Sequence, residues 1–458
     1  MKHFVRILSA GVLLMALCFI SYAQTSRPNI VVIVADDMGY ADIGPYGSKD
    51  IPTPNLDALA RDGVRFTDAY VSGPYCSPTR AGLLTGRYPQ RFGHEYNLLP
   101  NFVAAHSEAG LPLSEKTMAD RLRAAGYSTA LFGKWHLGSA PRFHPMERGF
   151  EEFFGFLDGG HSYMSPTVTE RNPLFDGRKH VAEPAYLTDV LADRAVEYIN
   201  RKRDKPYFLY LAFNAVHTPM EATEKYLKRF ENIKDNRRRT YAAMLSAMDD
   251  GIGKALDAID DNTLVFFFSD NGGPTTAGGP NGSSNAPLKG SKRTTWEGGV
   301  RVPFIVKWKG RIPAGATYSR PVIQLDVLPT ALAAAGIKLD ANNKFDGVNL
   351  LPFISRRGSA RPHDTLYWRT GGMMAIRKGD WKLLRMTDAA YTEQPYVIGD
   401  LSALQLYNLS DDISEAKNLA AANPKKVKEL AADWIRWAKS LGTPAWSPRE
   451  LPASGQTR

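Results

Sequence analysis

Residues 29–37 read Asn-Ile-Val-Val-Ile-Val-Ala-Asp-Asp, six consecutive apolar residues that end in two adjacent aspartates. A run that is apolar on both alternating faces is typical of a strand buried in the centre of a parallel sheet. Similar runs occupy residues 128–132, 207–213, 263–268 and 302–308. Helical patterns lie between them, at residues 55–62, 117–125, 187–201 and 241–259. This alternation predicts an α/β domain with a large, mostly parallel sheet flanked by helices.

Polar residues able to do chemistry follow four of these runs directly. They are Asp36 and Asp37, then Lys134 and His136, then His217, and finally Asp270 and Asn271. Taken one at a time, such residues are more often helix caps or structural hydrogen-bonding groups. Ligands of open α/β sheets bind beyond the carboxyl ends of the strands, where all of these residues would meet. Their convergence predicts a functional site at this edge of the sheet.

The residue types at this edge indicate a hard cation and a compact anion. The oxygen donors are Asp36, Asp37, Asp270 and Asn271. Oxygen donors suit Ca²⁺, and also Mg²⁺, whereas zinc more typically recruits histidine or cysteine. Positive charge can come from Arg80, Lys134, His136 and His217. Such a site favours a compact oxyanion, and both sulfate and phosphate fit that description.

The C-terminal part of the chain has a different pattern. Short strand-like runs at residues 365–368, 373–377 and 381–385 are followed by helical periodicity at 425–441. This order predicts a small antiparallel sheet with one helix, packed on the first domain. We therefore divide the mature chain into a catalytic domain at 24–358 and a C-terminal subdomain at 359–458. Residues 271–285 are rich in Gly, Pro, Ser and Asn and are expected to form a surface loop.

Residues 1–23 have the pattern of a secretory signal peptide. A basic start precedes an apolar run at 10–20, which is too short to span a bilayer comfortably, and residues 21–23 form a small-x-small cleavage site. A lipid anchor on Cys18 would need a small residue before it, where Leu17 stands. We expect an exported protein, periplasmic or secreted. No later run reaches the roughly 20 apolar residues of a membrane helix, so no membrane span is expected.

The chain is moderately basic, with 57 Lys and Arg against 47 Asp and Glu and a formal net charge of +10. A basic surface attracts anionic substrates, although a generic basic surface explains the composition equally well. We expect no nucleic-acid partner, and the composition does not indicate an oligomeric state.

Cys76 is the one cysteine expected to remain after export, because the only other cysteine is Cys18. A single thiol in an exported chain cannot form an internal disulfide, so it is either inert and buried or chemically special. It opens the segment Cys76-Ser77-Pro78-Thr79-Arg80, which continues as Ala-Gly-Leu-Leu-Thr-Gly-Arg through residue 87.

This segment resembles the Cys-x-Pro-x-Arg maturation motif of the type I, formylglycine-dependent sulfatases, together with its downstream extension. Further matching blocks lie at residues 34–39, 133–138, 285–292, 297–303, 405–409 and 418–420. The resemblance covers nearly all of the mature chain. It implies the alkaline-phosphatase-like α/β fold with a small C-terminal subdomain.

The resemblance also implies a chemical fate for Cys76. A formylglycine-generating or radical maturation enzyme, acting as a transient partner, would convert the cysteine to formylglycine, an aldehyde that hydrates to a geminal diol. One hydroxyl of the diol would attack sulfur, and the other would then expel sulfate and restore the aldehyde. The four oxygen donors named above correspond to the family's Ca²⁺ ligands. The ion would act as Lewis acid and template.

Other family roles carry over to matching positions. Arg80 would hold the formylglycine, and Lys134 and Lys292 would bind sulfate oxygens. His136 would deprotonate the diol, and His217 would protonate the departing alcohol. The assignment of Lys292 depends on aligning residues 289–293, where Ser291 and Arg293 stand at positions that are more often glycine in the family. Lys289 is the alternative.

These roles imply a sulfuric ester hydrolase that releases sulfate from a sulfated carbohydrate derived from a polysaccharide or glycosaminoglycan. Candidate sugar contacts are His94, Glu95, Asn97, His161 and Arg369, and each of them has an alternative structural interpretation. Two alternatives remain. One is a phosphomonoester or phosphonate hydrolase on the same fold, which would need a further set of zinc ligands that the sequence lacks. The other is an inactive binder of sulfated glycans, although the cysteine and the metal ligands are all retained.

Overall fold

The computed structural model describes residues 27–99, 108–164, 172–182, 185–275, 280–338, 344–355, 360–386 and 402–446. The predicted signal peptide, Cys18 and the predicted domain boundary at 358/359 lie outside these residues. Within them, no helix has both the length and the apolar character needed to cross a membrane.

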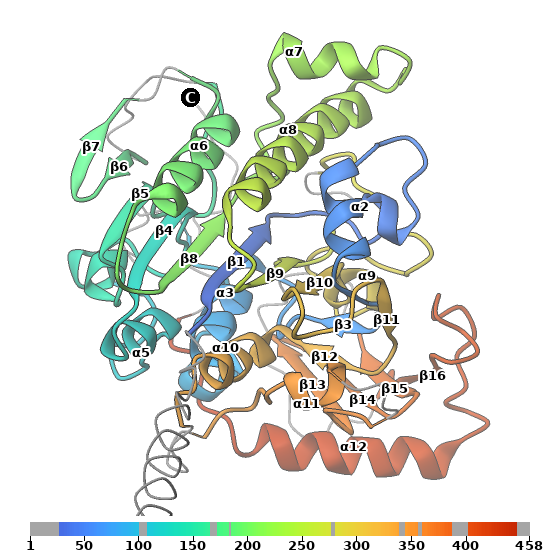
Figure 1. Ribbon diagram of the computed structural model, residues 1–458. Helices are drawn as coiled ribbons and strands as arrows, with labels where there is room; N and C mark the ends of the chain where they lie inside the picture. Colours follow the sequence, from blue (N-terminus) through green and yellow to red (C-terminus); the bar gives the residue numbers. More distant parts are fainter. Residues whose placement is uncertain are drawn as a thin grey trace, which may run out of the picture.

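A ten-stranded sheet forms the body of the protein (Figure 1). Its centre consists of five parallel strands in the spatial order β9 (Thr263–Ser269), β1 (Asn29–Ala35), β8 (Tyr207–Ala212), β4 (Ser128–Lys134) and β5 (Glu152–Phe156). Every residue of β1 after Asn29 is buried. The predicted α/β class with a mostly parallel sheet is therefore confirmed.

Further strands complete both edges of the sheet. One edge carries β10 (Phe304–Lys307), β2 (Val64–Phe66) and β11 (Ala316–Tyr318), and the other carries β6 (Leu174–Asp176) and β7 (Lys179–Val181). These strands join through antiparallel pairs, except that β11 pairs parallel with β2. The run at 302–308 was expected to join the parallel set, but β10 pairs antiparallel with β9. Phe304 lies opposite Phe268, so the long connection between them leaves and re-enters the sheet at the same edge, which reverses the strand. That connection carries part of the site described below.

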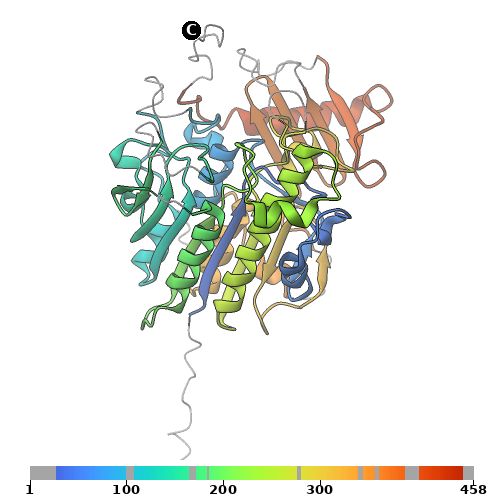
Figure 2. The ribbon, with the colours of Figure 1, turned by 90° about the horizontal axis from the view of Figure 1, so that it is seen from above.

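Helices cover both faces of the sheet. One face carries α2 (Pro54–Arg61), α6 (Leu187–Asn200) and α8 (Asn236–Ala258), and the other carries α3 (Cys76–Thr85), α5 (Met118–Ala124) and α10 (Val327–Ala334) (Figure 1). Figure 2 shows α6 and α8 lying over the sheet on either side of β1. Alternate residues of β1 enter opposite cores, with Val32 on the α3 side and Val31 and Ile33 on the α8 side. Shorter elements are β3 (Ala69–Tyr70), α7 (Glu224–Leu227), α9 (Glu297–Val300), β12 (Val322–Ile323) and α11 (Leu351–Ile354).

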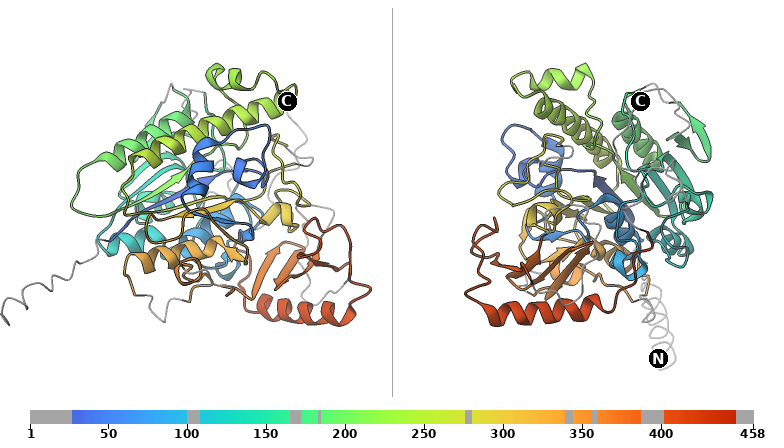
Figure 3. Two further views of the ribbon diagram at one scale, coloured as in Figure 1. Left: turned by 45° about the vertical axis from the view of Figure 1, so that its right-hand side comes forward. Right: turned by 180° about the vertical axis from the view of Figure 1, so that it is seen from behind.

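The C-terminal part forms a separate four-stranded antiparallel sheet, as predicted. Its strands are β13 (Thr365–Thr370), β14 (Met373–Lys378), β15 (Trp381–Arg385) and β16 (Gln405–Asn408). Helix α12 (Pro424–Ala438) runs along the outer side of this sheet (Figure 3), where the Trp434 indole donates to the Trp368 carbonyl at 3.0 Å. Strand β16 was not predicted, because four residues with two buried side chains give too short a pattern.

A buried ion network joins this small sheet to the main domain. The Lys382 ammonium lies 2.8 Å from a carboxylate oxygen of Glu297 and 2.9 Å from one of Glu415. All three side chains are inaccessible to solvent. Removing one member would leave an uncompensated buried charge, so the network fixes β15 against the start of α9.

Candidate functional site

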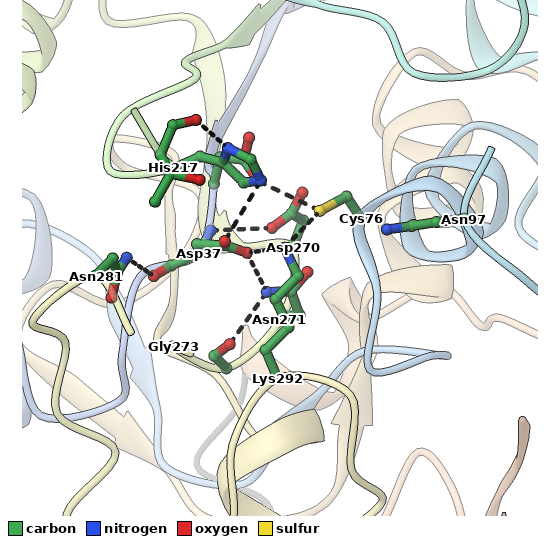
Figure 4. A network of polar contacts seen from close by, with 12 residues as sticks. Asp37, Cys76, Asn97, His217, Asp270, Asn271, Gly273, Asn281 and Lys292 are labelled. Carbon is green, nitrogen blue, oxygen red and sulfur yellow. Dashed lines mark hydrogen bonds and ion pairs between the residues drawn. The ribbon is translucent and has the colours of Figure 1, made fainter. Parts of the chain in front are cut away.

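Cys76 is the first residue of α3 and lies where the helix begins, beyond the carboxyl ends of β1 and β9 (Figure 4). Its side chain is almost fully buried. The Sγ atom lies 3.5 Å from Asp36 Oδ1 and 3.3 Å from Lys292 Nζ. The cysteine that the sequence singled out is therefore at the centre of the predicted strand-end site.

The thiol of Cys76 is not activated as it stands. Burial raises its pKa to about 12, and the positive charges of Lys134 and Lys292 offset only part of that effect. A thiol must be largely deprotonated to act as a nucleophile, and reactive cysteines have lowered pKa values. An unmodified Cys76 is thus a poor nucleophile at neutral pH.

The four predicted oxygen donors are brought together. Ala35 and Ser269 are opposite each other in the β1–β9 ladder, so the residues that follow them leave the sheet side by side. The Asn271 amide donates to Asp37 Oδ1 at 2.7 Å, and the Asp37 backbone N–H donates to Asp270 Oδ1 at 3.3 Å. Asp37 has a left-handed φ of 61°, which turns the chain sharply after β1.

Three cationic side chains face the three carboxylates. The pairs are Lys134 Nζ with Asp36 Oδ2 at 2.6 Å, Lys292 Nζ with Asp37 Oδ1 at 2.6 Å, and Arg80 Nη2 with Asp270 Oδ2 at 2.8 Å. Burial alone would raise the pKa of Asp37, but Lys292, His217 and Lys134 hold it well below its ordinary value. Burial and the adjacent Asp36 raise the pKa of Asp270. Further positive charge would stabilise the ionised form of Asp270.

This donor set fits a hard divalent cation. The Oδ1 atom of Asn271 is buried and has no hydrogen-bond donor among the described residues. A carbonyl oxygen in that position needs a donor or a cation. Potential ligand atoms of Asp36, Asp37, Cys76 and His217 all lie within 4.8 Å of one another. Carboxylate and amide oxygens at one point are typical of calcium and magnesium sites.

Both predicted catalytic histidines lie at the site, and each has its tautomer set by a backbone carbonyl. A carbonyl oxygen only accepts, so His136 Nε2 donates to Leu98 O at 3.0 Å and Nδ1 carries the lone pair. His217 Nδ1 donates to Thr218 O at 2.6 Å, which leaves Nε2 facing Asp37 Oδ2 at 3.6 Å. Leu98 could not be predicted as a site residue, because its contribution comes from its backbone carbonyl.

Burial also sets the charge of the two histidines. It lowers the pKa of His136 well below the ordinary value and that of His217 to about 3, although Asp37 partly opposes the shift at His217. Both rings are neutral near pH 7. His136 Nδ1 is buried without a hydrogen-bond partner among the described residues, so it is free to accept a proton.

The lysine that reaches the cysteine is Lys292. Lys289, the alternative, points elsewhere: its ammonium lies 3.8 Å from the centre of the Trp296 ring and donates to the Glu415 carbonyl at 3.2 Å. Ser291, at a position where glycine was expected, is accommodated because its hydroxyl donates to Gly273 O at 3.3 Å.

The five candidate sugar contacts all have partners within the protein. Glu95 forms an ion pair with Arg369 at 2.6 Å, and Asn97 Oδ1 accepts the Ser77 backbone N–H at 3.0 Å, at the start of α3. His94 is fully buried. His161 Nδ1 donates to its neighbour's carbonyl at 2.7 Å, and the ring lies 5.2 Å from that of Phe156. Their role as substrate contacts stays a prediction.

Two adjacent glycines, Gly159 and Gly160, lie against the two histidines, a role that could not be predicted from the sequence. A Cβ atom at Gly159 would come within 2.8 Å of the His136 ring, whereas one at Gly160 would make an ordinary 3.4 Å contact with His217. We expect Gly159→Ala to displace His136 and to lower kcat about tenfold or more, since small misplacements of a reacting group are costly. Gly160→Ala is the matched control, and we expect its kcat to change less than threefold. Equal kcat values for the two variants at equal Tm would contradict this assignment.

Two family models match the chain. The one described as Sulfatase covers residues 28–337, and the one described as N-sulphoglucosamine sulphohydrolase, C-terminal, covers residues 290–435. N-acetylgalactosamine-6-sulfatase of Rattus norvegicus is 35% identical over 394 residues, which is 81% of this chain and 73% of the relative. Arylsulfatase G of Rattus norvegicus is 33% identical over 477 residues, which is 90% of this chain and 88% of the relative.

One solved structure is similar over nearly the whole chain. The crystal structure of Ps i-CgsB in complex with k-i-k-neocarrahexaose superposes with a TM-score of 0.82 at 39% identity, covering 92% of this chain and 95% of that one. The similarity includes both the large sheet and the C-terminal subdomain.

Proposed function

The chain belongs to the sulfatase family and is a sulfuric ester hydrolase, and from this premise we propose that it releases inorganic sulfate from a sulfated carbohydrate. Two similar proteins support this substrate class, since one is an N-acetylgalactosamine-6-sulfatase and the crystal structure of the other is in complex with k-i-k-neocarrahexaose. We propose that this sulfated carbohydrate is derived from a polysaccharide or a glycosaminoglycan.

One observation carries the chemical proposal: Cys76 lies amid the cations and oxygen donors, yet its pKa is raised to about 12. An inert thiol would have no use for the surrounding cations and oxygen donors. Their presence is explained if residue 76 is converted to formylglycine. Conversion would supply a hydroxyl nucleophile in place of the thiol. We therefore propose a maturation enzyme as a transient partner of this chain.

Residues around position 76 would then bind the sulfate group, hold the site together and accept a proton. Lys134 and Lys292 place positive charge beside residue 76, where the oxygens of a sulfate group would lie. Arg80 donates to the Asp270 carboxylate and, at 3.1 Å, to the Lys134 carbonyl. It therefore fixes the ends of β9 and β4 relative to each other. The lone pair on His136 Nδ1 can accept a proton from residue 76.

On the opposite side of the reaction, His217 would deliver a proton to the departing alcohol. Its Nε2 atom faces Asp37, and the Thr218 carbonyl fixes the ring orientation through Nδ1. Burial keeps the free imidazole neutral at pH 7, so Nε2 would first take up a proton from solvent when the anionic substrate binds and would then pass it to the alcohol oxygen as the S–O bond breaks.

The metal proposal follows from the donor set. Asp36, Asp37, Asp270 and Asn271 would hold Ca²⁺, with Mg²⁺ as the second choice. The bound ion would supply Lewis acidity toward a sulfate oxygen. We also propose export to the periplasm or the medium after removal of residues 1–23, and a division of the mature chain into 24–358 and 359–458.

A panel of sulfated mono- and disaccharides tests the proposed substrate class. We expect the matured enzyme to release inorganic sulfate from at least one member with kcat/KM above about 10⁴ M⁻¹ s⁻¹, the lower end for typical enzymes. Aryl sulfate, a phosphomonoester and a phosphonate monoester serve as comparison substrates. Faster phosphate than sulfate release, or binding of sulfated sugars without any turnover by fully matured protein, would contradict the proposal.

A further inference from the structure

His94 takes part in a short chain of hydrogen bonds that ends at the backbone of His136. His94 Nε2 lies 2.6 Å from Ser77 Oγ, and Ser77 Oγ lies 2.7 Å from the carbonyl oxygen of His136. His94 and Ser77 are both fully buried. Ser77 is the residue directly after Cys76, so the chain of bonds connects the nucleophile's helix to a predicted catalytic base.

The direction of each hydrogen bond can be assigned. The His136 carbonyl can only accept, so the Ser77 hydroxyl donates its proton there. Ser77 Oγ then accepts from His94, which requires the proton of His94 to be on Nε2. Burial lowers the pKa of His94 to about 3, so the ring is neutral and carries a single proton. Its Nδ1 atom is buried without a hydrogen-bond partner among the described residues, which agrees with that tautomer.

The backbone at His136 needs support. Its φ is 58°, a left-handed conformation that is strained for a non-glycine residue. The Ser77 bond fixes the carbonyl side of this residue, and a 3.0 Å bond from the His136 N–H to Leu157 O fixes the other. Because the ring is carried by this backbone, the same bonds determine where His136 Nδ1 points.

The ring of His94 is itself held in place. Trp446 meets it edge to face, with ring centres 4.6 Å apart and an interplanar angle of 84°. The Trp446 indole N–H also donates to the Asn97 carbonyl at 3.4 Å. A buried ring fixed on two sides can transmit position, whereas a sugar contact would need access to solvent or to the pocket.

We propose that His94 and Ser77 form a positioning relay that holds the backbone of His136 in its left-handed conformation and so fixes the orientation of the His136 ring in the site. His94 is thus a positioning residue, which acts through Ser77 rather than on the substrate. The inference rests on the proposed sulfatase chemistry at the same site.

The relay is tested by kinetics of sulfate release with matched variants. His94→Leu removes the donor to Ser77, and we expect kcat to fall about tenfold or more with KM within twofold. His94→Gln keeps an N–H donor at nearly the same reach, and we expect kcat within threefold of wild type. His144→Leu is the control: His144 is another buried histidine, which caps the turn at Pro145–Glu147 away from the site. We expect it to leave kcat unchanged.

A double-mutant cycle gives a second, independent readout. Ser77→Ala breaks the same relay, so we expect His94→Leu/Ser77→Ala to be no slower than the slower single variant. Ser77 lies inside the maturation motif, so rates are expressed per mole of formylglycine, measured from the mass of the peptide containing residue 76. Multiplicative losses, a raised KM with unchanged kcat, or equal losses in His144→Leu would overturn the relay. An inactive, fully matured wild type would overturn the proposed function and the relay together, whereas an active wild type and fully active His94→Leu would overturn the relay alone.

Discussion

Cys76→Ala is expected to fold normally and to lose at least about 10⁴-fold of its sulfate-releasing activity, the scale of loss when a covalent nucleophile is removed. The substitution removes a small buried group whose sulfur contacts Asp36 and Lys292. Neither partner is left unpaired, since Asp36 keeps Lys134 and Lys292 keeps Asp37. The change should therefore cost little stability.

The same reasoning predicts that wild-type protein that has not been matured is inactive. With a pKa of about 12, the thiol of Cys76 is ionised in only about one molecule in 10⁵ at pH 7. Activity should therefore rise in proportion to the fraction of residue 76 converted, as measured by peptide mass, and should extrapolate to zero without conversion. Substantial turnover by Cys76→Ala, or by protein shown to be wholly unconverted, would contradict the role of residue 76.

Removal of divalent cations is the second change with a large expected effect. Exhaustive chelation should abolish sulfate release, and Ca²⁺ should restore it, because Asp37 is hydrogen-bonded to both Asp270 and Asn271 and the buried Asn271 Oδ1 has no hydrogen-bond partner among the described residues. Mg²⁺ should restore activity less well, because Mg²⁺ usually keeps several waters and binds through one or two carboxylates, whereas Ca²⁺ accepts a larger set of protein oxygens such as the four proposed here. The measurements are sulfate release during chelation and readdition, and metal content per chain.

Asp37→Asn tests the same site without a chelator. The amide removes one negative charge and keeps the shape of the side chain, so the affinity for Ca²⁺ should fall by about tenfold to a hundredfold. Excess Ca²⁺ should recover part of the activity. Asp250→Asn is a suitable control, because Asp250 is a partly exposed residue of α8 whose ion-pair partner is Arg229 and not a residue of the proposed metal site. Full activity in excess chelator, with no metal bound to wild type, would refute the metal assignment.

Much of the fold was predictable because its central strands are buried on both faces. An unbroken apolar run such as residues 30–35 is typical of a strand buried on both faces. Four such runs form β1, β4, β8 and β9. The edges were less predictable. Three-residue strands such as β6 and β11 have too few residues to show a period, and the reversal of β10 depends on where a long loop returns.

In the site, the groups that act through their side chains were predictable, and those that act through the backbone were not. Side chains that follow buried strands, such as Asp36 and His217, could be placed at one edge from the sequence, because parallel strands bring their carboxyl ends together. Groups that act through the main chain could not. The carbonyl of Leu98 and the missing Cβ of Gly159 leave no chemical signature in the sequence, although they orient His136.

The burial of Cys76 has a consequence for the order of events in biosynthesis. Residue 76 is in the first turn of a helix whose ten residues are all buried, between the large sheet and α10. A second protein cannot close an active site around a side chain enclosed in this way. If residue 76 is converted as proposed, conversion has to come before α3 docks, while residues 76–80 are still an extended peptide. Folding would then end the period in which this chain can become an active enzyme, so the rate of folding and the supply of maturation enzyme would together set the yield of active molecules.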